Sequence, residues 1–381
     1  MKRFLTGILF LMLLTGMSRA ETVFTPSSPS PYQDPNLNYW NLPMDITNEE
    51  AVWKVLTEPV TVLDNDRKDA EKSQVILRAG PSEEAEGIGV VTCVSQGVHV
   101  LERGAEWSLV ECYSSSFYNS AVLNWNALVQ GYVPTEFLRE VVPNQELGLV
   151  VDKLTQRMYV FWKGKLYSTL LVSTGLSNAK QPYNETRSGE FLLVSKVGEF
   201  ISDQMRCPLA LRFNSGDMIH EVPYILYENG KDYSATEWRL GTKASHGCIR
   251  VQREETPEGV NQQWLWKHYK KNTKLLIWED WQGRRVEVPD SETVLYRLNR
   301  NAVNYHVSSK CGAVKGKKLQ TLTYGQLEYE ENRKLTPCRK CAAPERVRDI
   351  IMKNLLYGPG GDHDPVMTQA LKTCPRTLKG K

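Results

Sequence analysis

The sequence of 381 residues has no apolar run long enough to cross a bilayer and no large excess of charge of one sign. Its most apolar stretch, Phe4 to Leu14, is far short of the ~20 apolar residues that a spanning helix needs. A multi-span membrane protein is therefore excluded. A hydrophobic content of 41% and a charged content of 24% also exclude a disordered or collagen-like chain. The length predicts two or three packed domains.

The short apolar run at the N-terminus has the flanks of a secretory signal peptide. Lys2 and Arg3 precede it, and Ser18-Arg19-Ala20 offers small residues at the two positions that a signal peptidase reads. We expect residues 1–20 to be removed and the protein to be exported to the periplasm or to the extracellular cell wall, without a transmembrane anchor. A retained N-terminal helix is the alternative.

The charge of the chain is unevenly spread. Without residues 1–20 there are 44 basic and 44 acidic residues, but from Asn301 to Lys381 there are 15 Lys or Arg against 7 Asp or Glu. A basic tail on an exported protein fits a polyanionic neighbour such as an envelope polymer, and we expect no nucleic-acid partner. A solvated basic face explains the same residues without any partner.

Two segments precede the region that carries the chemistry. Residues 21–59 are rich in Pro, Ser and Asn, which predicts a leader that buries little apolar surface, with one short helix around Asn48 to Leu56. Residues 60–143 predict a small all-β domain, because short runs rich in Val, Leu and Tyr alternate with polar residues between turn signals.

Several segments of this predicted β domain resemble the bacterial SH3-like family. They are Leu77-Arg78-Ala79-Gly80-Pro81-Ser82, Gly97-Val98-His99-Val100, Glu106-Trp107-Ser108-Leu109-Val110 and Gly131-Tyr132-Val133-Pro134. The resemblance implies a small β-barrel that targets cell-wall peptides. We expect His99 to be a surface strand residue, and Cys93 and Cys112 lie on runs that could pair and form a disulfide.

Residues 148–280 predict longer strands, beginning with a hairpin that turns at Lys163-Gly164-Lys165 and feeds a mainly antiparallel sheet. Within this region Cys248 follows Gly247 and lies two residues from His246, and His220 lies upstream. A thiol needs a base or a favourable field to act as a nucleophile. Gly247 leaves room for a substrate and for backbone N–H groups to face an oxyanion, and Arg250 adds positive charge.

The octapeptide Ala244-Ser245-His246-Gly247-Cys248-Ile249-Arg250-Val251 resembles the signature of the L,D-transpeptidase (YkuD) catalytic domain family. Flanking segments agree with it, namely Val172-Ser173-Thr174-Gly175, Thr186-Arg187-Ser188-Gly189-Glu190-Phe191, Met218-Ile219-His220 and Gln263-Trp264-Leu265-Trp266.

The resemblance implies a β-sandwich in which Cys248 takes an acyl group from a peptidoglycan stem peptide and His220 is the general base. It also implies that His246 and Gly247 shape the oxyanion site. Ser245 would support the loop, and Arg250 would hold a substrate carboxylate or brace the loop. No cofactor is needed for this catalysis.

The segment between His220 and Ser245 is longer than the family's usual interval. It contains Tyr224, Tyr233 and Trp238, which we expect to contact substrate if the segment forms a lid. An inert surface loop is the alternative. Glu221 stands where the family often has a small or hydroxyl residue that fixes the histidine tautomer, and its carboxylate would either orient His220 in the same way or raise the basicity of the imidazole.

Residues 301–345 predict a small Cys/His-rich module, followed by a basic tail over residues 346–381. His306, Cys311, Cys338 and Cys341 match a tetrahedral Zn²⁺ site, because imidazole nitrogen and thiolate sulfur are ligands that zinc prefers. Disulfide or dithiol chemistry is the competing explanation in an oxidising compartment. If zinc takes three thiols, Cys93, Cys112, Cys207 and Cys374 remain for up to two disulfides.

The sequence therefore predicts a mainly β protein: an SH3-like β-barrel, an L,D-transpeptidase-type β-sandwich and a Cys/His-rich C-terminal module. We expect an exported cysteine transpeptidase that acts on peptidoglycan stem peptides through a thioacyl intermediate. It would form L,D cross-links or remove or exchange terminal D-amino acids, with L,D-carboxypeptidase activity when water is the acceptor. A non-catalytic cell-wall-binding scaffold is the alternative from a different class.

Overall fold

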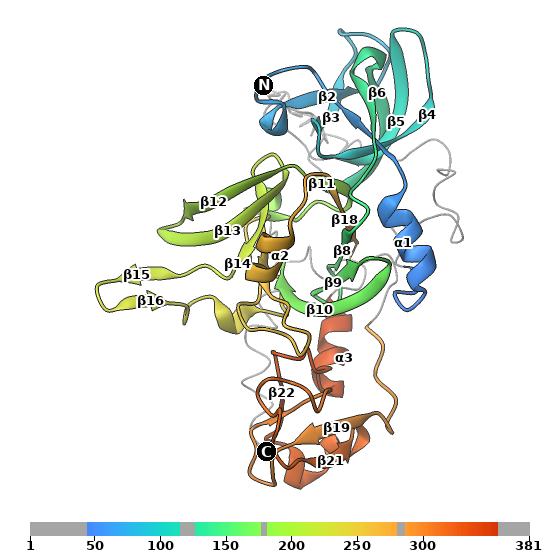
Figure 1. Ribbon diagram of the computed structural model, residues 1–381. Helices are drawn as coiled ribbons and strands as arrows, with labels where there is room; N and C mark the ends of the chain where they lie inside the picture. Colours follow the sequence, from blue (N-terminus) through green and yellow to red (C-terminus); the bar gives the residue numbers. More distant parts are fainter. Residues whose placement is uncertain (1–43, 115–125, 177–180, 280–285, 357–381) are drawn as a thin grey trace, which may run out of the picture.

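The computed structural model describes residues 44–114, 126–176, 181–279 and 286–356. The predicted signal peptide, the Ser-rich segment after Ser114 and Cys374 lie outside these residues. Figure 1 shows three parts in a row: an N-terminal β unit, a central sheet and a C-terminal module on the far side of that sheet. Among the described residues, no helix has the length and apolar character to cross a membrane.

The N-terminal β unit is a seven-stranded sheet of order β3-β2-β6-β5-β4-β1-β7. Its core is built from alternating apolar residues and includes Cys93 and Cys112. The all-β prediction for this region is confirmed, and its SH3-like character stays a prediction. The strands are β1 (Val60–Leu63), β2 (Gln74–Arg78), β3 (Gly87–Thr92), β4 (Gly97–Glu102), β5 (Trp107–Ser114), β6 (Ala127–Pro134) and β7 (Leu138–Val141), with short 3₁₀ turns at Ala70–Lys72 and Thr135–Phe137.

The central sheet has nine strands in the order β11-β18-β8-β9-β10-β17-β14-β13-β12. Only the β8–β18 and β14–β17 pairs are parallel, so the predicted mainly antiparallel sheet is confirmed. Its elements are β8 (Leu147–Asp152), β9 (Arg157–Trp162), β10 (Lys165–Ser173), β11 (Gly189–Leu193), β12 (Ser195–Ser202), β13 (Met205–Asn214), β14 (Asp217–Glu221), β17 (Ile249–Val251), α2 (Gln262–His268) and β18 (Thr273–Trp278), with a 3₁₀ turn at Pro182–Asn184.

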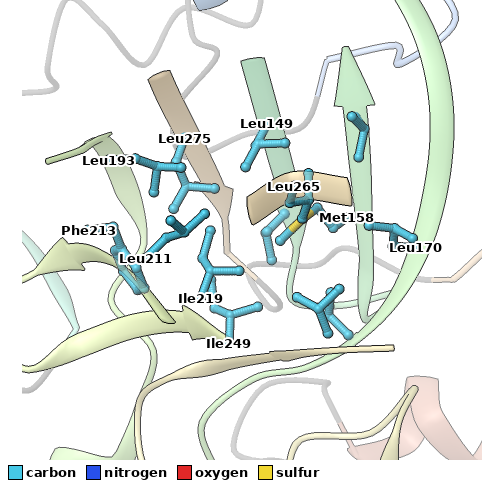
Figure 2. Close-up of a cluster of buried hydrophobic side chains, with 14 of the residues drawn as sticks. Leu149, Met158, Leu170, Leu193, Leu211, Phe213, Ile219, Ile249, Leu265 and Leu275 are labelled. Carbon is cyan, nitrogen blue, oxygen red and sulfur yellow. The ribbon is translucent and has the colours of Figure 1, made fainter. Parts of the chain in front are cut away.

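The core of this domain lies on one face of the sheet, under helix α2. Figure 2 shows Leu265 of α2 in one cluster with side chains from β8, β14, β17 and β18, among them Leu149, Ile219, Ile249 and Leu275. The helix begins where Asn261 accepts a hydrogen bond from the backbone N–H of Trp264, an N-cap of the usual kind. The strands that carry His220 and lead out of Cys248 are therefore anchored by a continuous apolar layer.

The predicted short helix is present as α1 (Glu49–Thr57), with Asn48 as its N-cap. The expectation that residues 21–59 bury little apolar surface is wrong for this helix. Val52 and Leu56 are fully buried against Val150 and Leu276, on the back of the central sheet. The composition of residues 21–59 is dominated by the Pro- and Ser-rich part before the helix, so it did not indicate that the nine-residue amphipathic helix is packed against the sheet.

The N-terminal β unit packs firmly against strand β11. The backbone N–H of Leu192 donates to Ser95 O at 2.7 Å, and Thr92 Oγ1 donates to Asn214 Oδ1 at 2.6 Å. His99 is buried with its Nε2 3.6 Å from Glu190 Oε2, so its prediction as a surface residue is wrong. The sequence pattern could not show that a second domain covers this strand.

The C-terminal module begins earlier than residue 301. Leu295 is in the same apolar cluster as Tyr305, Cys311 and Cys338, and residues 347–356 are helical rather than tail. We use the name C-terminal module for residues 294–356. It contains β19 (Val294–Arg297), β20 (Asn304–Tyr305), β21 (Gln320–Thr323), β22 (Thr336–Pro337), α3 (Val347–Leu356) and 3₁₀ turns at Gly325–Glu328 and Glu330–Asn332.

Candidate active site

The residues that the sequence singles out meet on two neighbouring strands. β14 carries His220, and β17 begins one residue after Cys248. The strands pair in parallel, with Ile219 opposite Ile249 and His220 opposite Arg250. Both isoleucines point into the core, so alternation along the strands places His220, Cys248 and Arg250 on the other face. Cys248 directly precedes β17 and is therefore next to Ile249, the residue that pairs with the neighbour of His220, Ile219.

His220 is held as a neutral base. Its Nδ1 lies 2.7 Å from the backbone carbonyl of Glu221, and because a carbonyl only accepts, Nδ1 carries the hydrogen and Nε2 is left as an acceptor. The ring packs edge-to-face against Phe200 at 5.4 Å. Burial lowers the pKa of His220 to about 4, and the charge of Arg250 acts in the same direction. The carboxylate of Glu221 does not orient the imidazole of His220, since it accepts from the hydroxyl of Tyr233.

Cys248 is a half-buried thiol on this face. Burial raises its pKa to about 12, and the negative charge of Asp217 adds to the shift, while Arg250 opposes it. At pH 7 the site therefore holds a neutral thiol and a neutral imidazole rather than a preformed ion pair. An attack by the sulfur would therefore require transfer of its proton to a base during the reaction.

Asp217 is a member of the site that the sequence interpretation missed. It is the first residue of β14, and burial raises its pKa to about 6, although the charge of Arg187 opposes the shift. A Cβ on Gly247 would lie 2.5 Å from Asp217 Oδ1, and Gly247 has a φ of +120°. Glycine is thus required before the cysteine on both counts. A single acidic residue after Gly216 predicts only a turn, so nothing in the sequence marked it.

The loop before β17 is tied down by side-chain hydroxyls. Ser245 Oγ donates to the carbonyl of Cys248, and Thr186 Oγ1 donates to the carbonyl of Gly247 at 2.7 Å. The N–H of Gly247 donates to Ser245 Oγ at 3.3 Å, and the N–H of Ser245 donates to Thr174 O at 3.0 Å. Ser245 braces the loop from within. The N–H of Gly247 must leave a long, weak bond before it can serve an oxyanion.

A buried charge network fixes the segments on either side of this loop. Lys153 Nζ lies 2.7 Å from Glu185 Oε1 and 3.0 Å from Glu279 Oε1, and Lys243 Nζ lies 3.0 Å from Glu185 Oε2. Removing one member would leave an uncompensated buried charge, which is strongly destabilising. Glu185, which follows the 3₁₀ turn at Pro182–Asn184, therefore joins the segment before β11 to the start of the loop at Lys243.

His246 and Arg250 lie at different depths. His246 is 49% exposed in its side chain, and its Nδ1 is 2.9 Å from Asp203 Oδ2 in the turn between β12 and β13. Arg250 is buried, and its positive charge favours the thiolates of Cys248 and of Cys207 on β13. His246 thus lies at the rim of the site. Arg250 is buried beneath it and contributes positive charge to the electrostatic field at Cys248.

The long segment after His220 forms a hairpin of β15 (Ile225–Tyr227) and β16 (Gly230–Asp232), followed by a 3₁₀ turn at Glu237–Arg239. Figure 1 shows the hairpin extending away from the central sheet. We call residues 221–242 the insertion. Of its three predicted substrate contacts, Tyr224 is buried and donates its hydroxyl to Glu199 Oε2 at 2.7 Å, which is a structural role. Tyr233 is half-buried, and Trp238 is 58% exposed.

A second cluster of reactive groups lies in the C-terminal module. The ligand atoms of His306, Cys311, Cys338 and Cys341 lie within 4.8 Å of one another, and all four residues are buried. Cys311 Sγ is 3.8 Å from Cys338 Sγ, and Cys341 Sγ is 3.9 Å from His306 Nδ1. Sulfur atoms in a tetrahedral zinc site with bonds of ~2.3 Å are about 3.8 Å apart, whereas a disulfide needs ~2.05 Å. The donor set and its spacing fit a zinc ion.

The remaining described cysteines are separate buried thiols. Cys93, Cys112 and Cys207 make no disulfide in the described part of the chain, so the Cys93–Cys112 bridge that the sequence left open is not formed. On the neighbouring strand β6, the residue opposite Cys112 is Val129. Burial raises the pKa of both Cys112 and Cys207 to about 12, as it does that of Cys248, but these two thiols are buried whereas Cys248 is partly exposed, so neither is accessible to a substrate.

Comparison with known proteins identifies the central sheet. The model of the family described as the L,D-transpeptidase catalytic domain (YkuD) matches residues 147–277. The Bacillus subtilis (strain 168) protein named "Putative L,D-transpeptidase YciB" is 26% identical over 141 residues, covering 36% of this chain and 68% of that protein.

Two solved structures are similar at low scores. The L,D-transpeptidase from Mycobacterium smegmatis is 16% identical with a TM-score of 0.28, covering 58% of this chain and 91% of that one. L,D-transpeptidase 3 from Mycobacterium tuberculosis, solved with a faropenem-derived adduct, is 14% identical with a TM-score of 0.28, covering 63% and 89%. The family match, which spans both His220 and Cys248, is the stronger finding. Residues 147–277 are thus the part of the chain that matches the L,D-transpeptidase (YkuD) catalytic domain family.

Proposed function

We propose that this protein is an exported thiol transpeptidase of peptidoglycan, with Cys248 as nucleophile and His220 as general base. The observation that carries the proposal is the β14–β17 pairing. It brings a half-buried thiol onto the same face as an imidazole whose Nε2 is free of its hydrogen, inside a domain of the L,D-transpeptidase family. A scaffold that had lost its activity would have no reason to keep this tautomer-fixed base beside a glycine-flanked thiol.

The proposed reaction has two halves. Cys248 Sγ attacks the carbonyl carbon of the amide that precedes the terminal D-amino acid of a stem peptide, and its proton passes to His220 Nε2. The imidazolium then protonates the leaving amine, which leaves a thioester on Cys248. A side-chain amine of a second stem attacks the thioester, gives its proton to His220 and restores the thiol. Water in the acceptor's place gives a carboxypeptidase, and a free D-amino acid gives exchange.

The other members of the site have supporting roles in this proposal. The loop of His246 and Gly247 faces the developing oxyanion, Ser245 braces that loop, and the positive field of Arg250 favours the thiolate as it forms. Of the insertion's aromatic residues, Trp238 offers the exposed ring for a substrate contact and Tyr233 a partly covered one. The SH3-like resemblance of the N-terminal β unit and the signal-peptide pattern support action in the periplasm or cell wall.

We also propose that His306, Cys311, Cys338 and Cys341 hold a structural zinc ion. All four ligands come from the protein, which is the arrangement of structural rather than catalytic zinc sites. Hydrogen bonding from Cys341, together with the proximity of His306, lowers the pKa of Cys338 to about 4, and the deprotonated sulfur is the form that binds metal.

The test of the proposed function is acylation followed by turnover. The purified protein is incubated with imipenem and measured by intact mass, and then with a tetrapeptide stem whose products are separated by mass. We expect one adduct per chain with imipenem, and loss of the terminal D-residue with the stem. An unmodified protein that releases no D-residue would instead support the wall-binding scaffold.

The pH dependence of acylation follows from the low pKa of His220. The base is neutral above about pH 4, so the rate of imipenem acylation should not fall between pH 7 and about pH 5 and should fall tenfold per unit below pH 4. A histidine of ordinary pKa would lose the reaction near pH 6.5 instead. Asp217, with its pKa of about 6, loses its charge in this range and thereby eases ionisation of Cys248.

Folding must be followed across the same pH range by circular dichroism. Because the pKa of His220 is lowered on folding, its contribution to the free energy of unfolding is present above pH 6.5 and is lost as the pH falls towards 4. A fall in acylation near pH 6.5 with folding intact would contradict the neutral-base assignment.

A further inference from the structure

The proposed zinc site lies next to the insertion. Between Cys338 and Cys341 the chain turns outward and presents Arg339 and Lys340 to the catalytic domain. Arg339 Nη1 donates to the carbonyl of Glu237 at 2.8 Å, and Nη2 donates to the carbonyl of Trp238 at 2.7 Å. One guanidinium therefore donates hydrogen bonds to two successive backbone carbonyls of the insertion's 3₁₀ turn.

The residue after the last cysteine extends this contact into an apolar cluster. Ala342 packs with Leu171 of β10, with Val222 and Leu240, which are both buried residues of the insertion, and with Tyr233. Val222 follows His220 by two residues, and its N–H donates to Val251 of β17 at 3.0 Å. The residue that follows the cysteine turn, Ala342, thus packs against an apolar cluster that includes Val222, and Val222 is hydrogen-bonded to β17 just beyond the end of β14.

A third contact runs through the insertion itself. Arg253 Nη2 lies 3.0 Å from Glu237 Oε1, and its guanidinium stacks 3.9 Å from the ring centre of Tyr233. The hydroxyl of Tyr233 approaches Glu221, whose backbone carbonyl holds His220. The chain of contacts from the cysteine turn therefore ends at the residue that fixes the tautomer of the general base.

The contacts between the Cys338–Cys341 turn and the catalytic domain differ in strength, and the strongest of them depend on the orientation of this turn. The Lys340–Glu254 pair at 2.6 Å is exposed on both sides, and exposed ion pairs contribute little to stability. Arg339 makes two charge-assisted hydrogen bonds, but both depend on the orientation of a four-residue turn. A turn clamped at both ends by metal keeps that orientation, and the same turn without metal has two loose thiols at its ends.

We propose that the C-terminal module is a zinc-dependent brace for the active site: the metal rigidifies the Cys338–Cys341 turn, and Arg339 and Ala342 hold the insertion against the catalytic domain. This proposal rests on the zinc site proposed above. Arg339 is a positioning residue, since it acts on the substrate-facing segment and not on the reacting atoms. Loss of metal would release the 3₁₀ turn that carries Trp238 while leaving Cys248 and His220 in the sheet.

The experiment combines metal analysis with hydrogen–deuterium exchange on the full chain. Zinc is measured by elemental analysis in wild type, Cys311→Ser, Arg339→Ala, Arg339→Lys and Arg333→Ala. Exchange is followed for the amides of Arg239, Leu240 and Thr242, which donate within the 3₁₀ turn, and for β9 as an internal reference. Arg333→Ala is the matched control, because that exposed arginine pairs only within its own module.

We expect one zinc per chain in wild type and in every arginine variant, and none in Cys311→Ser. Exchange of the three amides should rise at least tenfold in Cys311→Ser and in chelated wild type, and severalfold in Arg339→Ala. Arg339→Lys, which can satisfy only one carbonyl, should lie in between, and Arg333→Ala and β9 should not change.

The possible failures are distinguishable. Zinc absent from wild type would overturn the metal site and the brace together. Zinc present, with exchange in the insertion unchanged in Arg339→Ala, would overturn the brace alone. If Cys311→Ser does not fold, the Arg339 variants, which keep the metal, decide the question. Imipenem adduct formation is read separately, so failure of the transpeptidase assignment cannot be mistaken for either.

Discussion

Replacing Cys248 with serine should lower the rate of imipenem and stem-peptide acylation by about 10⁴-fold or more, since loss of a nucleophile in a hydrolase typically costs this much. A hydroxyl is a far weaker acid than a thiol, and the His220 base, whose pKa is about 4, is too weak to activate it. The measurement is the initial rate of adduct formation by intact mass at pH 7.

The matched control for Cys248→Ser is Cys207→Ala. Cys207 is a buried thiol on neighbouring strand β13, and Arg250 influences its pKa as it does that of Cys248. We expect this variant to form the adduct within about threefold of the wild-type rate, a margin typical of indirect effects. Adduct formation that persists in Cys248→Ser and vanishes in Cys207→Ala would mean that the nucleophile has been assigned to the wrong thiol.

Replacing His220 with asparagine should lower the same rates by about 10²- to 10⁴-fold, which is the usual contribution of a general base. An asparagine amide nitrogen can keep the hydrogen bond to the carbonyl of Glu221, but nothing replaces the acceptor at Nε2. The fall in rate below pH 4 should also disappear in this variant, because the group that titrates there is gone. A purely structural role for His220 would not remove that feature of the pH profile.

His268→Asn provides the control for this substitution. His268 lies on α2, its Nδ1 is 2.9 Å from the carbonyl of Trp264, and its ring stacks on Trp264 at 3.9 Å. It therefore shares the hydrogen-bonding pattern of His220 without facing Cys248. We expect its acylation rate and pH profile to match wild type. An equal loss in both variants would point to a general effect of histidine removal on folding.

Local patterns predicted the parts of the site that are built from continuous segments. The hairpin at Lys163-Gly164-Lys165 is present, His220 lies on strand β14, and the loop through Cys248 leads into β17. Turn chemistry and strand alternation act over a few residues, so they can be seen in a single sequence. The same holds for the His306 and Cys341 cluster, whose spacing already indicated a common ligand.

Features that depend on packing between distant segments were not predictable. Asp217 matters because it is buried beside Gly247, and His99 is buried because β11 of another domain covers it. Arg187 donates to Gln96 of the N-terminal β unit at 3.0 Å and also opposes the pKa shift of Asp217. The N-terminal β unit, which we predicted to be a wall-binding module, is thus hydrogen-bonded to a residue whose charge acts on Asp217. In the described residues the two domains are packed together rather than joined only by a linker.

The place of β18 in the central sheet has a consequence for how the molecule can mature. Thr273–Trp278 pairs with β8 on one side and with β11 on the other, and Lys274 donates to the carbonyl of Val55 in α1. Strands β8 and β11 therefore become joined only after the later segment β18 has been made, and such long-range pairing is slow. A polypeptide that ends before Trp278 would lack the strand that joins them, so the central sheet would be divided although Cys248 is already part of the chain.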